Sequence, residues 1–180
     1  MTYRIGIDPG ITGAIALLGP AGELDDLLDM PTMLLTGTRQ KVNAAELGKI
    51  IGRWTDLPGL TALLEQVSAM PGQGVSSMFG FGMSYGIVQG VLGALQIPVT
   101  FVTPQCWKKR AGIPAKSEKD YSRTIAQQLY PNASLERKKH VGRADAILIA
   151  RFGLGSASVK SPRTLRAVES PMQPSLLESA

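Results

Sequence analysis

The chain has 180 residues, of which 44% are hydrophobic and 18% are charged, and its formal net charge is +5. This length and balance fit one domain with a packed core. No apolar run reaches the roughly 18 to 20 residues that a bilayer span needs, and the amino terminus shows no basic-then-apolar signal pattern, so we expect a cytoplasmic protein. The single cysteine, Cys106, excludes an internal disulfide framework and a cysteine-based zinc site, and we interpret it as a buried small hydrophobe.

The chain opens with strand signals. Apolar, β-rich runs predict strands at residues 3–8 and 14–19, and a third near Leu24 to Leu28. Asp8 ends the first run and begins the turn Asp8-Pro9-Gly10-Ile11-Thr12-Gly13. A carboxylate at a strand end is a candidate metal or phosphate handle. Asp, Pro and Gly are also ordinary turn residues, so the motif alone leaves both interpretations open.

The next stretch changes from loop to helix. Residues 30–41, which contain Pro31, Gly37 and Arg39, are predicted to form a loop. Asn43 then caps a predicted helix over residues 44–54. Leu47, Ile50, Ile51 and Trp54 fall at the spacing of one helical face, which should pack on the sheet.

A second carboxylate stands near the end of another apolar run. Residues 60–67 have the composition of a buried strand, interrupted by Glu65. An ionised group in an apolar setting is costly unless it is paired or metal-bound, so Glu65 lies either at the exposed end of the strand or in a ligand set.

Glycines mark the helix that follows. After a Gly/Ser/Met-rich loop at 68–77, the sequence predicts a helix from Met78 to Gln96. Four glycines recur along it every three or four residues: Gly82, Gly86, Gly90 and Gly93. Because each costs a helix up to about 1 kcal/mol relative to Ala, the stripe indicates tight packing, against either the sheet or a partner subunit.

The carboxyl-terminal half contains one strand, two helices and a tail. Residues 97–102 predict a strand, 117–130 a helix, and 143–152 a final helix that carries Asp145 among apolar residues. We expect residues 1–155 to form the single domain and 156–180 to be a flexible tail.

Basic residues gather between Thr103 and Arg143, where three acidic residues oppose them. A solvated surface and a face that binds a polyanion both explain such a cluster. The basic residues are Lys108, Lys109, Arg110, Lys116, Lys119, Arg123, Arg137, Lys138, Lys139 and Arg143.

Three acidic residues on separate elements are the main chemical signal. Strands first and helices interleaved later predict an α/β fold, a mixed sheet flanked by helices, with Asp8, Glu65 and Asp145 far apart in sequence. Carboxylates gathered from different elements can hold one or two Mg²⁺ ions, and two such ions can stabilise the attacking and leaving oxygens of a phosphodiester hydrolysis.

These motifs together resemble RuvC-type Holliday-junction resolvases of the RNase H-like nuclease fold, in particular short versions encoded by phages. The resemblance covers roughly residues 3–153. Ile7-Asp8-Pro9-Gly10 with Thr12-Gly13 is similar to the first acidic motif of the family, and Leu64-Glu65-Gln66-Val67 to the second. The run from Pro104 through Lys108, Lys109, Gly112 and Lys116 is similar to its basic DNA-contacting segment, and residues 143–150 to its last motif.

The resemblance implies a magnesium-dependent endonuclease that resolves four-way DNA junctions. Asp8, Glu65 and Asp145 would be catalytic metal ligands for two Mg²⁺ ions in each active site, with Mn²⁺ able to substitute and no small-molecule cofactor. A resolvase cuts two symmetry-related strands, so we expect a homodimer, with the glycine-striped helix as its interface. In a phage-encoded protein, the location would be the bacterial host cytoplasm.

The expected DNA-binding residues come from the basic segment and one aromatic. They are Lys108, Lys109, Lys116, Lys119, Arg143 and Phe79. Lysine contacts to phosphate position a nucleic acid without reading its bases. For Phe79, two roles remain open: helix core, or an apolar wedge at the junction centre. Trp107 is interpreted as core.

The sequence departs from the family at one position. Members usually have a further acid or histidine one helical turn before the final aspartate, where this chain has Gly142. His140, the single histidine, is the nearest replacement as a metal ligand or water-activating base. It would reach the site if the helix begins near Gly142. A surface or phosphate-contacting role for His140 is the alternative.

Two other classes of protein also share parts of this pattern. The Asp-Pro-Gly-x-Thr-Gly turn resembles the phosphate loop of actin-like ATPases and sugar kinases, but a second glycine-rich phosphate loop is missing. A non-catalytic branched-DNA-binding protein of the same fold is the stronger rival, because the acid before Asp145 is absent. A broader nuclease for forks and flaps is not distinguishable by sequence from a resolvase.

Overall fold

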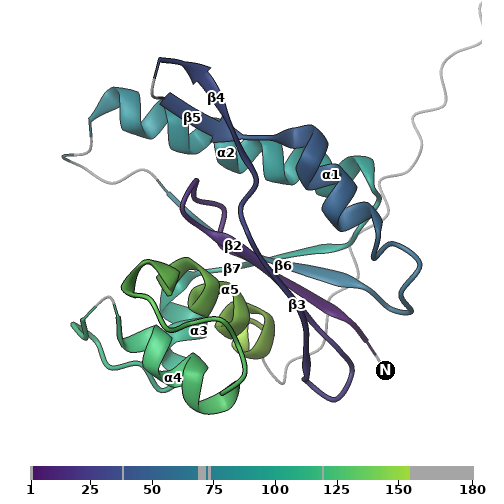
Figure 1. Ribbon diagram of the computed structural model, residues 1–180, viewed down its shortest axis with the longest axis vertical. Helices are drawn as coiled ribbons and strands as arrows, with labels where there is room; N and C mark the ends of the chain where they lie inside the picture. Colours follow the sequence, from purple (N-terminus) through teal and green to yellow (C-terminus); the bar gives the residue numbers. More distant parts are fainter. Residues whose placement is uncertain (1, 38, 69–71, 73, 119, 155–180) are drawn as a thin grey trace, which may run out of the picture.

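A computed structural model describes residues 2–37, 39–68, 72, 74–118 and 120–154. Within them, a five-stranded sheet is covered by helices on both faces, and a separate two-stranded hairpin stands beside it (Figure 1). This arrangement confirms the predicted mixed sheet flanked by helices. The tail predicted at 156–180 lies outside the described residues.

The central sheet has the strand order β3-β2-β1-β6-β7. Strands β1, β2 and β3 form an antiparallel meander, whereas β6 pairs parallel with β1 and β7 pairs parallel with β6. The strands are β1 (Arg4–Ile7), β2 (Ala14–Leu18), β3 (Leu24–Asp29), β6 (Thr61–Glu65) and β7 (Val99–Val102). The parallel centre places the carboxyl ends of β1, β6 and β7 at one edge of the sheet.

The helices divide between the two faces. Helices α1 (Ala44–Gly52) and α2 (Val75–Ala94) cover one face, and α3 (Pro104–Arg110), α4 (Tyr121–Leu129) and α5 (Val141–Phe152) cover the other (Figure 1). Each face buries its own apolar cluster. One packs Leu47, Ile51 and Leu92 against the sheet, and the other is built around Trp107 and the apolar side of α5.

Helix α5 lies directly on strand β1 because Gly6 has no side chain. A Cβ at Gly6 would overlap the carbonyl oxygen of Ala146 and lie 2.5 Å from the backbone nitrogen of Ala150. The backbone of α5 therefore occupies the space that any other residue at position 6 would fill. This contact fixes the depth at which α5 sits on the sheet.

Most predicted elements are present within a few residues of their expected bounds. Asn43 caps α1 as predicted, its side chain accepting a hydrogen bond from the backbone N–H of Glu46 at 3.2 Å. The loop prediction for residues 30–41 is wrong: β4 (Thr32–Thr36) and β5 (Arg39–Val42) pair as an antiparallel hairpin. Its turn contains Gly37 with φ of 57°. Three exposed apolar residues on β4, Met33, Leu34 and Leu35, do not alternate with polar ones, so the usual strand signal is missing.

Helix α2 is exposed along its glycine stripe. A Cβ added at Gly82, Gly86, Gly90 or Gly93 would meet no atom within 4 Å. The expectation that these glycines permit close packing against the sheet is therefore wrong, and Ser84, Val88 and Leu92 face the core instead. No described residue packs on the stripe, and the other explanation, a partner subunit, stays a prediction.

Helix α3 and the 3₁₀ turn η1 (Lys138–His140) were not anticipated as helical. Pro104 occupies the first turn of α3, where a missing N–H costs nothing. Within the described residues, none of the helices combines the length and the apolar character that crossing a bilayer requires.

Candidate active site

Asp8 and Glu65 lie next to each other at the carboxyl ends of two paired strands. Strand β1 pairs parallel with β6 so that Ile7 is opposite Leu64. One residue further along each strand, Asp8 is therefore next to Glu65. The carboxyl ends of parallel strands are where open α/β sheets bind ligands. The sequence predicted both carboxylates at strand ends, and the register brings them together.

The turn after β1 holds the Asp8 carboxylate. The backbone N–H of Asp8 donates to the carbonyl of Ala14 at 3.1 Å, and the N–H of Gly10 donates to Asp8 Oδ1 at 3.2 Å. A Cβ on Gly13 would overlap the carbonyl oxygen of Asp8. The Asp-Pro-Gly-x-Thr-Gly sequence thus makes a tight turn and also fixes the orientation of a carboxylate, so the two interpretations of this motif are compatible.

Glu65 is held by a tryptophan from another element. The indole Nε1–H of Trp107, on α3, donates to Glu65 Oε1 at 2.9 Å. The Trp107 side chain is fully buried, which confirms its interpretation as a core residue. The hydrogen bond to Glu65 was not predicted. Nothing in the spacing of Trp107 distinguishes a donor to a carboxylate from a purely apolar core residue.

Asp145 reaches the same region from helix α5. A Cβ on Gly142, one turn earlier, would lie 2.5 Å from the carbonyl oxygen of Thr12, 2.9 Å from Gly13 Cα and 3.3 Å from Asp8 Oδ2. The first turn of α5 therefore packs directly against the Asp8 turn. This contact brings Asp145 toward the two strand-end carboxylates.

One oxygen of Asp145 is buried without a partner. Its Oδ1 is inaccessible to solvent and makes no hydrogen bond within the described structure. The hydroxyl of Ser122, on α4, acts on Asp145 and lowers its pKa, although neither Ser122 Oγ nor Asp145 Oδ1 makes a regular hydrogen bond. A buried carboxylate oxygen without a donor is costly unless something else, such as a cation, satisfies it.

All three carboxylates have raised pKa values, and burial is the largest cause for each. The pKa of Asp145 rises from 3.8 to about 7, and the charges of Asp8 and Glu65 contribute to that rise. The charge of Asp8 also raises the pKa of Glu65. Carboxylates that raise one another's pKa share one space, and this pattern is typical of functional sites.

These three residues fit a divalent cation by chemistry, since carboxylate oxygens are the ligands that Mg²⁺ prefers. The unpaired Oδ1 of Asp145 and the mutual repulsion are what a cation would relieve. Among the residues that the structure describes, however, no three His, Cys, Asp or Glu side chains lie close enough to form a ready-made metal site. The arrangement brings the ligands near one another without closing them into a cage.

Position 142 cannot hold the acid that the resembling family carries there. With the backbone in place, a side chain at Gly142 would overlap Thr12 and Gly13. The glycine at position 142, where this chain departs from the family that it resembles, is thus required by the close packing of α5 on the Asp8 turn.

His140 lies at the last position of η1, directly before α5. It is 8% exposed, and its Nδ1 accepts a hydrogen bond from the backbone N–H of Arg137 at 3.4 Å. Burial is the largest cause that lowers the pKa of His140, followed by the charge of Arg143, so it is neutral at pH 7. The carboxylates that act on it are those of Asp29 and Glu136, and the structure does not pair it with Asp8, Glu65 or Asp145.

The arginines of the basic segment hold the fold together. Arg143 forms a two-pronged ion pair with Asp29 at 2.6 and 2.8 Å and also donates to the carbonyl of Ser134. Arg110 donates to the carbonyl of Gly153 at 2.8 Å, and Arg123 pairs with Asp120. The guanidinium of Arg143, expected to bind DNA, is therefore already occupied by protein acceptors.

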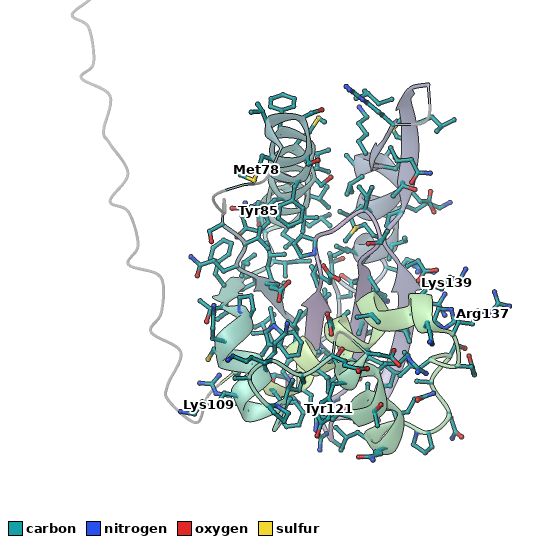
Figure 2. All side chains as sticks on the ribbon, turned by 90° about the vertical axis from the view of Figure 1, so that its left-hand side faces the viewer. Met78, Tyr85, Lys109, Tyr121, Arg137 and Lys139 are labelled. Atoms are coloured by element: carbon teal, nitrogen blue, oxygen red, sulfur yellow. The ribbon has the colours of Figure 1, made fainter. Side chains whose placement is uncertain are left out.

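The lysines are placed differently from one another. Lys108 is exposed, its Nζ lies 5.3 Å from the centroid of the Trp107 ring, and its charge lowers the pKa of all three carboxylates. Lys109 projects from one side of the molecule, whereas Arg137 and Lys139 project from the opposite side (Figure 2). The basic segment therefore does not form a single face.

Two further lysines were expected to contact DNA. Lys116 is exposed in the loop between α3 and α4, with φ of 69°. Lys119 lies outside the described residues.

A groove lies between α2 and the β4–β5 hairpin, close to the Asp8 turn. Its lining includes Ile11 of that turn, Leu35 and Arg39 of the hairpin, and Phe79 and Phe81 of α2. Phe79 is 73% exposed, so its interpretation as helix core is wrong. The sequence did not anticipate the hairpin and therefore could not reveal this groove.

Comparison with known proteins gives one curated relative. The chain is 32% identical over 99 residues to "Holliday junction resolvase MOC1, chloroplastic" from Chlamydomonas reinhardtii. The match covers 54% of this chain but only 11% of that protein, so the chain spans about a tenth of the length of the relative. No family model matches the chain.

Two solved structures of Thermus thermophilus RuvC share the fold. One, of RuvC alone, superposes with a TM-score of 0.51 at 21% identity. The other, RuvC in complex with a Holliday junction substrate, superposes with a TM-score of 0.53 at 14% identity. Each covers 83% of this chain and 91% of the RuvC chain. The chain therefore has the RuvC fold, and the predicted RNase H-like fold class is confirmed.

Proposed function

We propose that this chain is a structure-selective endonuclease that resolves four-way DNA junctions by metal-dependent hydrolysis of phosphodiester bonds at symmetric positions. The observation that carries the proposal is the convergence of Asp8, Glu65 and Asp145 on one space, with each pKa raised by burial. The name of the curated relative and the junction bound in one RuvC complex agree with this chemistry.

Asp8, Glu65 and Asp145 would hold Mg²⁺, or Mn²⁺ in its place, with two ions per site as the expected number. The cation would supply Lewis-acid stabilisation of the charge that develops on phosphate oxygens and a water of lowered pKa. The protein's part is to keep the three carboxylates ionised and oriented. Gly10 and Trp107 orient two of them through hydrogen bonds, and Lys108 favours the ionised form of all three.

Lys108 acts on the phosphate that is cut, whereas Lys109 and Lys116 act on phosphates further away. A cation beside the carboxylates counters the negative charge that a bound phosphodiester adds. Exposed lysines elsewhere neutralise DNA phosphates and strengthen binding without reading sequence. His140 stays the candidate for a water-activating base, since it is neutral and stands directly before the helix of Asp145.

A homodimer would give the two active sites that symmetric cutting needs. The glycine stripe of α2 is the proposed interface, because no described residue packs on Gly82, Gly86, Gly90 or Gly93. Two such stripes related by a two-fold axis would let the helix backbones approach closely. Phe79, exposed on the same helix, would wedge into the junction centre.

The first experiment incubates the protein and Asp8→Asn with a labelled four-way junction and a matched linear duplex, with Mg²⁺ or with EDTA. We expect paired nicks near the junction that require Mg²⁺, are absent from the duplex and are lost in Asp8→Asn. Asp56→Asn, an exposed aspartate, is the matched control and should cut like the parent protein.

A non-catalytic junction-binding protein is the second candidate function. It is favoured by the lack of a ready-made three-ligand metal site among the described residues and by the glycine at position 142. Junction binding without cleavage in either Mg²⁺ or Mn²⁺ would support this alternative and contradict the nuclease.

A second experiment tests the DNA-binding lysines. The junction affinity of Lys109→Ala and Lys116→Ala is measured over a range of salt concentrations. Each variant should reduce the slope of log affinity against log salt by about one. Arg110→Ala is the control in the same segment, because its guanidinium binds protein carbonyls and its loss should leave the slope unchanged.

A further inference from the structure

Trp107 contacts Glu65 through a hydrogen bond that is not explained by packing alone. The indole is fully buried, and its Nε1–H points to Glu65 Oε1 at 2.9 Å, across 42 residues of sequence. An indole N–H can only donate, so its partner must be an acceptor. A carboxylate oxygen serves best when it is ionised, as it is in a cation site.

The bond fixes one oxygen of a flexible side chain. A glutamate loses rotamer freedom when it is held in one conformation. In this protein the glutamate is already ordered before any ligand binds. The Trp107 ring that holds it is packed in the core beneath α5 and is therefore itself fixed. The Glu65 carboxylate is thereby held in one orientation, and its remaining lone pairs can bind a ligand.

The placement of Trp107 follows from the fold. Strand β6 pairs with β7 so that Glu65 is opposite Val102, and α3 begins two residues after Val102. The fourth residue of α3 is Trp107, and the fifth is Lys108, whose charge acts on the same carboxylates. One short helix thus supplies both a fixed hydrogen-bond donor and a nearby cation to the end of β6.

We propose that Trp107 is a positioning residue for Glu65: its N–H holds Oε1, so that the carboxylate would meet a divalent cation in a fixed orientation. The inference rests on the proposed function only for its effect on cleavage and stands independently for metal binding. Outer-shell hydrogen bonds of this kind are typically worth a factor of 10 to 100 in metal affinity or activity.

The test compares the same substitution at the chain's two tryptophans. Trp107→Phe keeps an aromatic ring in the core and removes the N–H. Trp54→Phe is the matched control, because Trp54 is also buried but belongs to the apolar cluster on the other face of the sheet. Calorimetric titration with Mn²⁺ should give a Kd about 10 to 100 times higher for Trp107→Phe and an unchanged Kd for Trp54→Phe.

A second measurement does not depend on the stability of Trp107→Phe. In Trp54→Phe, Trp107 is the sole tryptophan, so its fluorescence reports on the Glu65 contact. Titration with Mg²⁺ should change the emission of Trp107 in a saturable way, and the change should disappear when Glu65→Gln is added. The positioning role would be overturned if the Mn²⁺ Kd were unchanged in Trp107→Phe, or if Trp107 emission stayed constant during the Mg²⁺ titration.

The outcomes separate this inference from the proposed function. A protein that binds Mn²⁺ in a Trp107-dependent way but cuts no junction would retain the positioning role and lose the nuclease. The opposite result is cleavage that depends on magnesium with the same half-maximal Mg²⁺ concentration in Trp107→Phe and in the parent protein. That result would retain the nuclease and refute the positioning role. A rise of that concentration by about tenfold, with the rate at saturating Mg²⁺ preserved, supports both.

Discussion

Helices α5 and α2 cover opposite faces of one sheet, and glycine serves opposite purposes on the two sides. On the α5 side, Gly6 and Gly142 are filled by neighbouring backbone, and any side chain there would overlap it. On the α2 side, Gly86 and Gly90 face open space. On the α5 side, glycine lets a helix pack closely on the sheet, whereas on the α2 side no described residue covers the glycine stripe.

The two sides of the sheet therefore suit different roles, the α5 side the proposed chemistry and the α2 side the proposed assembly. Close packing of α5 brings Asp145 to Asp8 and Glu65, at the energetic cost of burying three carboxylates together. The α2 side leaves Phe79 and the glycine stripe exposed, as an interface for DNA or a second subunit would be. The first region is packed within the chain, whereas the glycine stripe of the second meets no described residue of this chain.

The largest effect is expected from Asp145→Asn on the α5 side. Asp145 has a pKa of about 7 when folded against an ordinary 3.8, so the folded protein binds its proton more tightly than the unfolded chain does. The folded state therefore gains stability as pH falls from 7 toward 4 and carries the full penalty above pH 7. At about 1.36 kcal/mol per tenfold change in proton affinity, that penalty is on the order of 4 kcal/mol.

Asparagine cannot ionise, so Asp145→Asn should stabilise the protein at pH 8 by up to about 4 kcal/mol in EDTA, with little difference near pH 4. Urea unfolding at both pH values measures this. Asp56→Asn, at an exposed position, should show no such pH-dependent gain. Cleavage should be lost in Asp145→Asn despite the higher stability. Equal stability of the Asp145 variant and the parent protein at pH 8 would contradict the buried charge repulsion.

Gly6→Ala tests the close packing of α5 directly. Its Cβ would overlap the Ala146 carbonyl, so α5 must move away from β1. Overpacking of this kind costs about 1 to 3 kcal/mol or more, and thermal unfolding should show a fall in Tm of roughly 2 to 4 °C for each kcal/mol. The control is Gly86→Ala on α2, which should raise stability by up to about 1 kcal/mol. If Gly6→Ala left Tm unchanged, the contrast between the two sides of the sheet would be refuted.

Gly90→Leu tests whether the bare side of α2 is covered by a second copy. A Cβ at position 90 would meet no atom of the described residues within 4 Å, so the monomer should stay within about 0.5 kcal/mol of the parent stability. Sedimentation equilibrium should show a dimer Kd at least about tenfold higher, which corresponds to about 1.4 kcal/mol. Ala45→Leu adds bulk at an exposed position on α1 and should not affect the dimer. A parent protein that is monomeric at micromolar concentration without DNA would refute this interface.

Phe79→Ala should have the smallest effect on stability and a selective effect on DNA. Since Phe79 is 73% exposed, the free energy of unfolding should change by less than about 0.5 kcal/mol. Loss of an aromatic platform should weaken junction binding by about 1 to 3 kcal/mol, with linear duplex affinity unchanged. Fluorescence anisotropy with both DNAs measures the difference. Leu129→Ala, exposed on α4 across the sheet, is the control, and equal weakening in both variants would exclude a wedge.

Sequence patterns predicted the elements that obey simple periodicity. The strands before Asp8 and Glu65 were found because buried strands read as apolar runs, and α1 was found from its Asn43 cap and its apolar face. The β4–β5 hairpin was missed because its exposed Leu34 and Leu35 do not alternate with polar residues. For Phe79 the sequence left helix core and an exposed wedge both open, because an aromatic in an apolar helix can face either way until the fold shows which side is buried.

By itself the sequence determined that three carboxylates stand on elements with helix or strand signals, since those signals are local and depend on spacing and turn chemistry. Tertiary structure decided what those carboxylates meet. The parallel register of β1 and β6 sets Asp8 beside Glu65, and backbone contacts at Gly6 and Gly142 bring in Asp145. The tertiary structure also pairs Arg143 with Asp29 and makes the Trp107 side chain a hydrogen-bond donor to Glu65. Contacts between residues 42 or 114 positions apart leave no periodic trace in the sequence, because they depend on how whole elements pack.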